Sequence, residues 1–334
     1  MAQSRFSKID EYGFERPDDF DYQTYETFMS QYLQILARRS KKWTTLMKSE
    51  QALKKKRILK SYIRKGIPNE YREKVWLHVS GANEAKIKHG VDLYKKMVAS
   101  THDTTLVEAI RIDLPRTFPD NIFFNSSDEH QEMLFRVLIA YAHHNKKVGY
   151  CQGMNYIAGL ILLVTKNEDS TFWLLKALVE NILPDYYSPT MDGLLTDIDT
   201  VSELVRLKYP EVSKHVAELG LPWPVITTKW FICIYCEVLP TETVLRIWDC
   251  LFNEGSKIVF RVALTIIGLH ISEILSTTQF SEMNDCLKKI VKGPPTVHCH
   301  NFTQSIFKVP GKLTTKVINR IRETVSQERK QKKD

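Results

Sequence analysis

The sequence predicts an all-α protein made of many short helices. Apolar residues return at three- and four-residue spacing in separate segments of the 334-residue chain, which is the period of one face of an α-helix. Strict apolar and polar alternation over the length of a strand is hard to find, and no Asn-Gly hairpin turn occurs. The composition, 43% hydrophobic with 13 glycines and 13 prolines, fits a globular protein with a substantial core.

The helical pattern can be followed in order along the chain. Pro17-Asp18-Asp19 supplies a start signal for the first helix. The apolar stripes are Tyr25, Phe28, Met29, Tyr32, Leu33 and Leu36; Leu134, Val137, Leu138 and Tyr141; Ile198, Val201, Leu204 and Val205; and Val244, Leu245, Trp248, Leu251 and Phe252. The turn signals between segments are Lys65-Gly66-Ile67-Pro68, Leu114-Pro115, Phe118-Pro119-Asp120, Leu183-Pro184-Asp185, Gly220-Leu221-Pro222 and Lys292-Gly293-Pro294-Pro295. Asp192-Gly193 is interpreted as a loop between helices.

Three regions are expected from these signals. Residues 1–62 form a helical N-terminal extension with a charged end. Residues 63–278 form a dense helical body, and residues 279–334 form a helical C-terminal segment with a basic tail. We find no internal repeat.

No feature of the sequence indicates a membrane-spanning or secreted protein. The N-terminal residues lack the apolar core of a secretory signal, and neither end carries a lipidation signal. The longest apolar runs, 156–164 and 262–271, are far shorter than the ~20 residues that span a bilayer. Six cysteines without a signal peptide are expected to be reduced thiols, so we expect a cytoplasmic protein.

The net charge of +8 favours acidic partners or anionic surfaces. Because the basic residues are spread out and mixed with acidic ones, we expect no nucleic acid partner. Two basic runs, residues 54–57 and 329–333, are interpreted as solvated helix faces. The tail, residues 317–334, has a thin apolar face, so we expect at most weak peripheral contact with an anionic membrane.

Several kinds of chemistry are disfavoured. The C-x-x-C at Cys233-Ile234-Tyr235-Cys236 invites a zinc site, and His298-Cys299-His300 lies downstream. However, the C-x-x-C stands in an apolar run that we expect to be helical, so buried thiols explain it better than a metal. The sequence contains no P-loop, no G-x-G-x-x-G and no G-x-S-x-G, so we expect this chain to hold no nucleotide itself.

A first polar stretch stands at residues 110–119. Asp113 and Arg116 are three residues apart, so on a helix they share a face and can pair. Pro115 ends or begins a helix beside Arg116, which places the arginine near the end of an element. Taken alone, this stretch is more simply a surface ion pair of little energetic weight.

A second polar stretch stands at residues 148–155. Gly149 and Gly153 permit positive φ or close backbone approach, which predicts a shaped loop that leads into a helix at 157–164. Gln152 carries both a hydrogen-bond donor and an acceptor, as the positioning of a water molecule requires. Taken alone, this stretch is equally a capping loop whose glutamine satisfies backbone groups.

Together, the two stretches resemble the two signature motifs of the TBC-domain Rab GTPase-activating proteins. The matching residues are Ile110-x-x-Asp113-x-x-Arg116 and Tyr150-x-Gln152-Gly153-Met154-Asn155. Arg64-Lys65-Gly66-Ile67-Pro68 with Arg72 and Trp76 resembles the start of the domain, and residues 246–255 resemble a later block. The resemblance covers about residues 63–278 and implies a TBC domain of two helical subdomains.

The resemblance also implies a mechanism. Arg116 would be an arginine finger and Gln152 a glutamine finger, both supplied in trans to a GTP-loaded Rab GTPase. Asp113 would hold Arg116, while Tyr150, Gly153 and Asn155 would shape the glutamine loop. The Rab would bind GTP and Mg²⁺, so the chain would need no cofactor and would be an activator rather than an enzyme.

Two other functions remain open. The first is a non-catalytic Rab-binding scaffold, against which the presence of both Arg116 and Gln152 argues. The second is a peripheral membrane adaptor that acts through the basic tail. The Rab partner would place the chain in the cytoplasm or at vesicle and organelle membranes, in vesicle trafficking.

Overall fold

The computed structural model describes residues 7–49, 51–125 and 128–331. Across these residues the secondary structure is helical, and β-type pairing is limited to the isolated bridges Ile9 with Glu15 and Phe14 with Asn121. The prediction of an all-α fold is confirmed. None of the helices in the described residues is long and apolar enough to cross a membrane.

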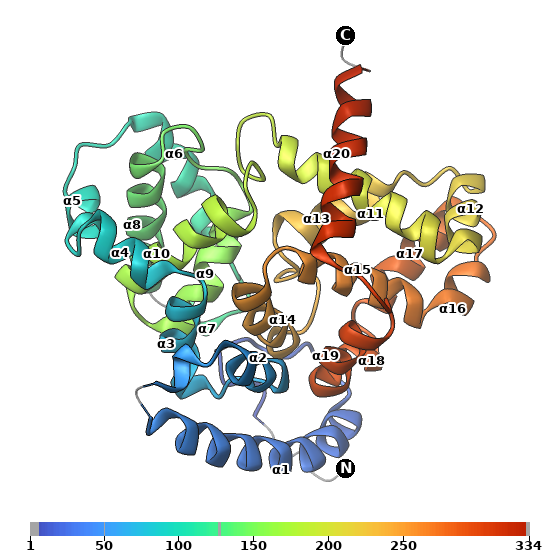
Figure 1. Cartoon of the computed structure of the whole chain (residues 1–334), viewed down its shortest axis with the longest axis horizontal. Helices are drawn as coiled ribbons and strands as arrows, with labels where there is room; N and C mark the ends of the chain where they lie inside the picture. The colour runs from blue at the N-terminus through green and yellow to red at the C-terminus, as the bar shows by residue number, and fades with distance from the viewer. Residues whose placement is uncertain (1–6, 50, 126–127, 332–334) are drawn as a thin grey trace. The chain divides into compact units, whose positions relative to one another are not determined.

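The helices form two compact units, residues 1–181 and 182–334 (Figure 1). This division follows the packing of the helices and does not coincide with the three regions expected from the sequence, which stay a prediction. Unit 1 contains α1 (Tyr22–Met47), η1 (Ala52–Lys54), α2 (Lys56–Lys65), α3 (Asn69–Val79), α4 (Ala82–His89), α5 (Leu93–Val98), α6 (Thr104–Asp113), η2 (Leu114–Arg116), α7 (Ile122–Asn125), α8 (Asp128–His144), α9 (Met154–Thr165) and α10 (Glu168–Ala177). The π-helical turn η3 (Leu178–Ile182) follows α10.

The core of unit 1 is built around α9. All of its residues are buried except Tyr156 and Val164, which are half-buried, and it packs against α3, α8 and α10. This explains why its sequence is apolar all round. The stripe predicted at residues 134–141 lies on α8 and is buried, as expected.

The first helix begins later than its start signal suggested. Asp21 caps α1 by accepting a hydrogen bond from the Thr24 N–H at 2.9 Å, four residues after Pro17. Buried Trp43 connects α1 to the chain after α2, because its indole N–H donates to the Gly66 carbonyl at 2.9 Å. The N-terminal extension is therefore packed into unit 1.

Unit 2 consists of α11 (Asp192–Lys208), α12 (Pro210–Glu218), α13 (Trp223–Ile232), α14 (Thr241–Glu254), α15 (Lys257–Leu269), α16 (Ile271–Leu275), α17 (Phe280–Ile290), α18 (Pro294–Val297), α19 (Cys299–Lys308) and α20 (Thr315–Gln331). Its core lies at α14 and α15, whose apolar residues are almost all buried. The stripes predicted at residues 198–205 and 244–252 are buried on α11 and α14.

Two local predictions in unit 2 are wrong. Asp192 is the first residue of α11, so Asp192-Gly193 is not a loop. A Cβ on Gly193 would lie 2.3 Å from the Pro184 carbonyl oxygen, and this close approach explains the glycine at a helix start. The C-x-x-C is not helical either, because α13 ends at Ile232 and the two residues between the cysteines have positive φ.

The basic tail forms α20, which packs along α11. Arg322 donates to both carboxylate oxygens of Asp197 at 2.7 Å, and Arg329 pairs with Asp199 at 2.8 Å. Of the three residues expected to form the thin apolar face of the tail, Ile318 and Val325 are buried and Ile321 is half-buried. Most of the apolar face of the described part of the tail is thus turned into unit 2, while Val317 remains 44% exposed.

Candidate functional site

The first loop of the candidate site joins α6 to α7 in unit 1. α6 ends at Asp113, and the chain tightens into the 3-10 turn η2, in which Pro115 precedes Arg116. The Thr117 hydroxyl donates to the Asp113 carbonyl at 2.8 Å. Thr117 and Phe118 are buried, whereas Arg116 is exposed. The loop therefore presents the guanidinium of Arg116 to solvent from a buried base.

The second loop joins α8 to α9. Both predicted glycines have positive φ, 62° at Gly149 and 107° at Gly153, so the prediction of a shaped loop is confirmed. The Gly153 N–H donates to the Asn155 side-chain carbonyl at 3.0 Å, which fixes the entry into α9. Gln152 is exposed at the tip, and the three residues after it are buried.

Three hydrogen bonds join the two loops. The Tyr150 hydroxyl donates to Oδ2 of Asp113 at 2.7 Å. The Asn155 amide donates to Oγ1 of Thr117 at 2.8 Å, and the Tyr156 hydroxyl donates to the Arg116 carbonyl at 3.2 Å. The loops are thereby fastened at their bases, while their tips, Arg116 and Gln152, stay free to meet a partner.

The contact with Asp113 affects the protonation of Tyr150. Burial, together with the hydrogen bond to the neighbouring carboxylate of Asp113, raises the pKa of the Tyr150 phenol. Tyr150 therefore remains a neutral donor at neutral pH. Because Asp113 is only 7% exposed, its carboxylate depends on this donor.

One expected contact is not formed. The sequence suggested that Asp113 would pair with Arg116 through helical spacing, but within the described part of the chain the Asp113 carboxylate bonds to Tyr150 and Arg116 has no ion pair. The physical reason is Pro115, because the α-helical geometry on which that spacing depends ends at Asp113. Asp113 supports the arginine loop by holding it to the second loop.

The N-terminal segment braces the same arginine loop, which the sequence did not predict. The ring of Phe14 packs edge-on against Phe118, with 5.1 Å between ring centroids. Asn121 donates to the Tyr12 carbonyl at 2.9 Å, and the Ile122 N–H donates to the Gly13 carbonyl at 2.9 Å. Pairing between residues 12–15 and 120–122 spans more than 100 positions, so no local pattern could indicate it.

Helix α9 approaches the arginine loop closely at Gly159. A Cβ at this position would lie 3.1 Å from the Phe118 ring and 3.3 Å from the Thr117 methyl group. The Tyr156 ring, one turn earlier, contacts Phe118 at 5.5 Å between centroids. A glycine within an otherwise apolar helix was the one sequence signal for this contact.

One exposed apolar side chain precedes Arg116 by four residues. Ile112, in the last turn of α6, is 58% exposed. Its neighbour Arg111 is held by a bidentate contact with Glu132 and lies 3.9 Å above the ring of Phe135. An exposed apolar side chain in the same segment as an exposed arginine is suited to contact with a protein partner.

The other candidate sites have structural explanations. Among the described residues, no group of three or more His, Cys, Asp or Glu side chains could hold a metal ion. In the block that resembles the start of the domain, Arg72 is buried and donates to the Tyr12 hydroxyl at 2.7 Å, and Trp76 is fully buried. In the later block, Trp248 donates to the Ile234 carbonyl at 3.0 Å within the core of unit 2.

Residues 69–275 match the family model of the Rab-GTPase-TBC domain. The chain therefore belongs to the Rab-GTPase-TBC family. This membership supports, in general terms, a role as a GTPase-activating protein with Rab GTPases as partners.

The comparisons also find similar individual proteins. The chain is similar to human growth hormone-regulated TBC protein 1, with 49% identity over 324 residues that cover 96% of each chain. It is 48% identical over 325 residues to growth hormone-regulated TBC protein 1-A of Danio rerio, covering 97% of this chain and 91% of that one. Among solved structures, the Chlamydomonas flagellar RabGAP TBC domain superposes with a TM-score of 0.77 at 30% identity, covering 90% of this chain and 99% of that chain.

Proposed function

We propose that this protein accelerates GTP hydrolysis by Rab GTPases with two residues supplied together, Arg116 and Gln152. The observation that carries this proposal is the pair of loops in unit 1. Each loop exposes one of these side chains at its tip, and three hydrogen bonds fasten the loops at their bases. Two side chains that act on one bound nucleotide must be held at a fixed distance and orientation to each other, and these hydrogen bonds hold the two loops in place.

Arg116 would act on the transferring phosphoryl group. Negative charge spreads over the phosphoryl oxygens in the transition state, and a planar, permanently charged guanidinium can donate to two of them at once. Arg116 has no ion pair among the described residues, so no carboxylate has to be displaced before it can engage the phosphate. The partner GTPase would bind the GTP and the Mg²⁺.

Gln152 would position the attacking water. Its amide can accept a hydrogen bond from the water and donate one at the same time. The adjacent Gly153, with φ of 107°, turns the chain so that Gln152 is exposed while Asn155 is buried. Asp113, Tyr150 and Asn155 would be positioning residues that keep this loop against the arginine loop.

The test is single-turnover hydrolysis across a panel of GTP-loaded Rab GTPases. The full chain is compared with Arg116→Ala, Arg116→Lys and Gln152→Ala. We expect acceleration of a subset of Rabs, with a loss of about 10³–10⁵-fold in Arg116→Ala, the range that an arginine finger contributes. Arg116→Lys should also lose most of the acceleration, because an ammonium group lacks the bidentate fork.

A matched control is Arg320→Ala, which removes an exposed arginine from α20. It should accelerate hydrolysis as the unchanged protein does. A fully active Arg116→Ala variant would refute the arginine role. Binding of GTP-loaded Rab without acceleration, by folded protein, would instead indicate a non-catalytic scaffold.

A further inference from the structure

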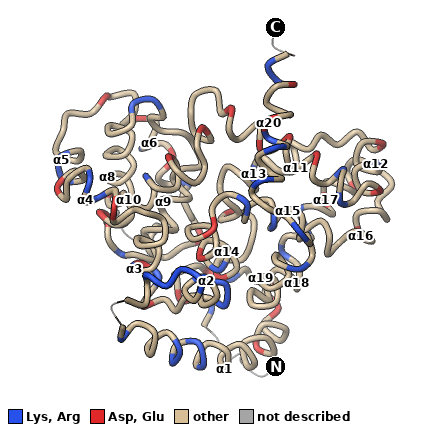
Figure 2. Tube along the Cα trace, in the orientation of Figure 1, with Lys and Arg blue, Asp and Glu red and all other residues tan. Residues whose placement is uncertain are grey.

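The positive charge of the chain is concentrated in one short stretch. Residues 27–68 contain 12 Lys and Arg residues and one acidic residue, Glu50, which gives this stretch a net charge of +11. Because the whole chain has a net charge of +8, the remainder carries −3. The stretch corresponds to most of α1, with η1 and α2, and Figure 2 shows Lys and Arg along both α1 and α2.

Most of these charges are available to a partner. Nine of the 12 basic side chains are exposed, among them Arg38, Lys41 and Lys42 on α1 and the run at residues 54–57. Within the described residues, none of these nine has a carboxylate at ion-pair distance. The basic surface of α1 and α2 is therefore not neutralised by the protein itself.

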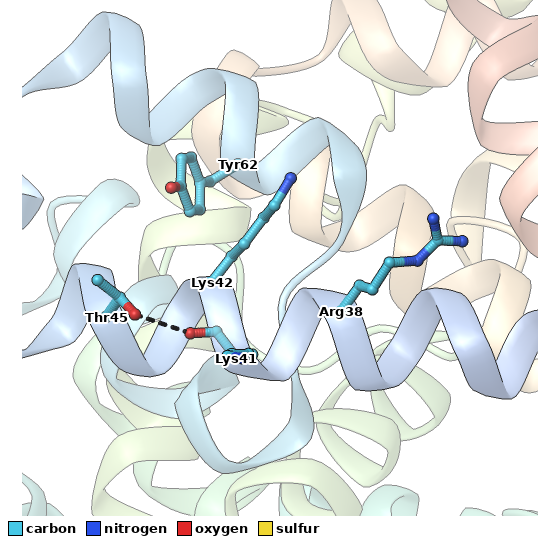
Figure 3. Close-up of a pocket in the computed structure, with 5 residues that line it drawn as sticks. All are labelled: Arg38, Lys41, Lys42, Thr45 and Tyr62. Atoms are coloured by element: carbon cyan, nitrogen blue, oxygen red, sulfur yellow. Dashed lines mark hydrogen bonds between the residues drawn. The ribbon is translucent and has the colours of Figure 1, made fainter.

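This surface contains a cavity of about 330 Å³ lined by Arg38, Lys41, Lys42, Thr45 and Tyr62. Figure 3 shows Lys42 extending from α1 toward α2, beside Tyr62, and Arg38 projecting from the adjacent turn of α1. Three of the five lining residues have cationic side chains, and none has a carboxylate. Such a set favours a compact anion with several negative charges.

The cavity has a rigid base. Trp43 is fully buried between the two helices, packs edge-on against Tyr62 at 5.7 Å between ring centroids, and is anchored by its hydrogen bond to the Gly66 carbonyl. The two helices that carry the cationic groups are thus held together by packing in unit 1.

An exposed apolar residue lies next to the cavity. Ile58 is 45% exposed and stands one turn before Tyr62, on the same side of α2. Clustered Lys and Arg on a helix with a neighbouring apolar side chain are typical of contact with an anionic bilayer, in which the apolar group enters the interface. The charged backbone of a nucleic acid would offer this apolar side chain less to contact than a bilayer does.

We propose that the α1–α2 surface docks on a membrane and that its cavity binds a lipid headgroup bearing more than one phosphate, of the phosphoinositide class. Arg38, Lys41 and Lys42 would contact the phosphates, and Ile58 would insert beside them. The basic residues at 54–57 would add attraction to the surrounding anionic lipids. Among the described residues, no side-chain hydrogen bond joins Arg38, Lys41, Lys42 or Ile58 to the loops that carry Arg116 and Gln152, so the two proposals can be tested by separate substitutions.

The test is vesicle sedimentation with the full chain. Phosphatidylcholine vesicles containing phosphatidylinositol bisphosphate are compared with vesicles of equal total charge containing phosphatidylserine. We expect tighter binding to the bisphosphate vesicles and a loss of roughly thirty-fold in the double variant Arg38→Gln with Lys42→Gln, since each basic residue near an anionic surface contributes about fivefold. The matched control, Lys316→Gln with Arg320→Gln, removes two exposed charges from α20 and should bind as the unchanged chain does.

Three results would overturn the proposal. One is no binding to either vesicle. The second is equal loss in the control variant, which would indicate general charge attraction. The third is binding of soluble inositol trisphosphate, or of a short RNA duplex, as tight as binding to the vesicles and equally dependent on Arg38 and Lys42. The double variant should keep its acceleration of GTP hydrolysis in solution, so failure of this proposal is distinguishable from failure of the proposed function.

Discussion

Replacing Tyr150 with phenylalanine tests whether the two loops of the candidate site act as one unit. The substitution removes a single hydroxyl and keeps the ring. That hydroxyl is the donor to Oδ2 of Asp113 at 2.7 Å, and the Asp113 carboxylate is only 7% exposed. The change therefore leaves a buried carboxylate without its donor and removes the strongest of the three bonds between the loops.

The size of the effect follows from the charge on the acceptor. A hydrogen bond to a charged group contributes about 1.5–3 kcal/mol, compared with about 0.5–1.5 kcal/mol for a neutral pair. We expect Tyr150→Phe to lower the free energy of unfolding by about 1.5–3 kcal/mol. The same energy changes the equilibrium constant between joined and separated loops by roughly 10- to 150-fold. The loss of acceleration should therefore not exceed this factor.

The assay combines urea unfolding with steady-state Rab GTP hydrolysis. We expect kcat for the stimulated reaction to fall more than KM rises, because Tyr150 holds the fingers and does not itself have to bind the Rab. Tyr156→Phe is the matched control, since it removes a hydroxyl that donates to the neutral Arg116 carbonyl at the longer distance of 3.2 Å. Equal effects of the two variants, or no effect of Tyr150→Phe on either measurement, would refute the reasoning.

Two further changes separate docking from stability. Ile112→Asp places a charge on a side chain that is 58% exposed and four residues before Arg116. It should raise the Rab concentration for half-maximal acceleration about tenfold. Ile87→Asp, at a 77% exposed position on α4, should leave that concentration unchanged, and equal behaviour of the two variants would contradict a docking role. Arg322→Ala leaves the buried Asp197 carboxylate without its bidentate partner. It should lower the free energy of unfolding by about 3 kcal/mol. This value is at the low end of the range for a broken buried ion pair, because a quarter of the Arg322 side chain is exposed. A denaturation midpoint unchanged from the original would show that this pair does not hold α20.

The helices themselves were largely predictable from the sequence. The stripe from Leu134 to Tyr141 lies fully buried on α8, because a three- and four-residue period directly encodes which face of a helix meets the core. The same pattern was less accurate on α1, where Leu33 is 50% exposed. A long helix at the edge of a unit buries only part of its apolar stripe, and the sequence does not indicate which part.

The contacts of the site were less predictable than its residues. Asp113 was assigned to Arg116 because three-residue spacing is a local signal, whereas its actual donor, Tyr150, is 37 positions away. The brace from Phe14 to Phe118 is more distant still. Pairing between remote segments depends on how the helices pack, and neither period nor spacing carries that information.

The basic run at residues 54–57 illustrates the same limit. The sequence alone indicates a solvated helix face, and the exposure of these four residues agrees with this interpretation. The run alone does not indicate that α2 packs against α1 through Trp43. Because of this packing, the charges of residues 54–57 extend the surface formed by Arg38, Lys41 and Lys42. The spatial gathering of charge, rather than its local density, distinguishes a binding surface from a solubilising one.

The architecture of the two loops bears on why an activator of this kind would be efficient. Arg116 is followed by buried Thr117, and Gln152 is followed by buried Gly153, so each exposed side chain stands on backbone that is already ordered. Binding a partner then requires ordering of side chains alone, so little conformational entropy is lost when the partner binds. The N-terminal segment contributes to this ordering through Phe14, even though it lies far from both fingers in sequence. Residues 9–15 are therefore as much a part of the candidate site as the helices that carry its motifs.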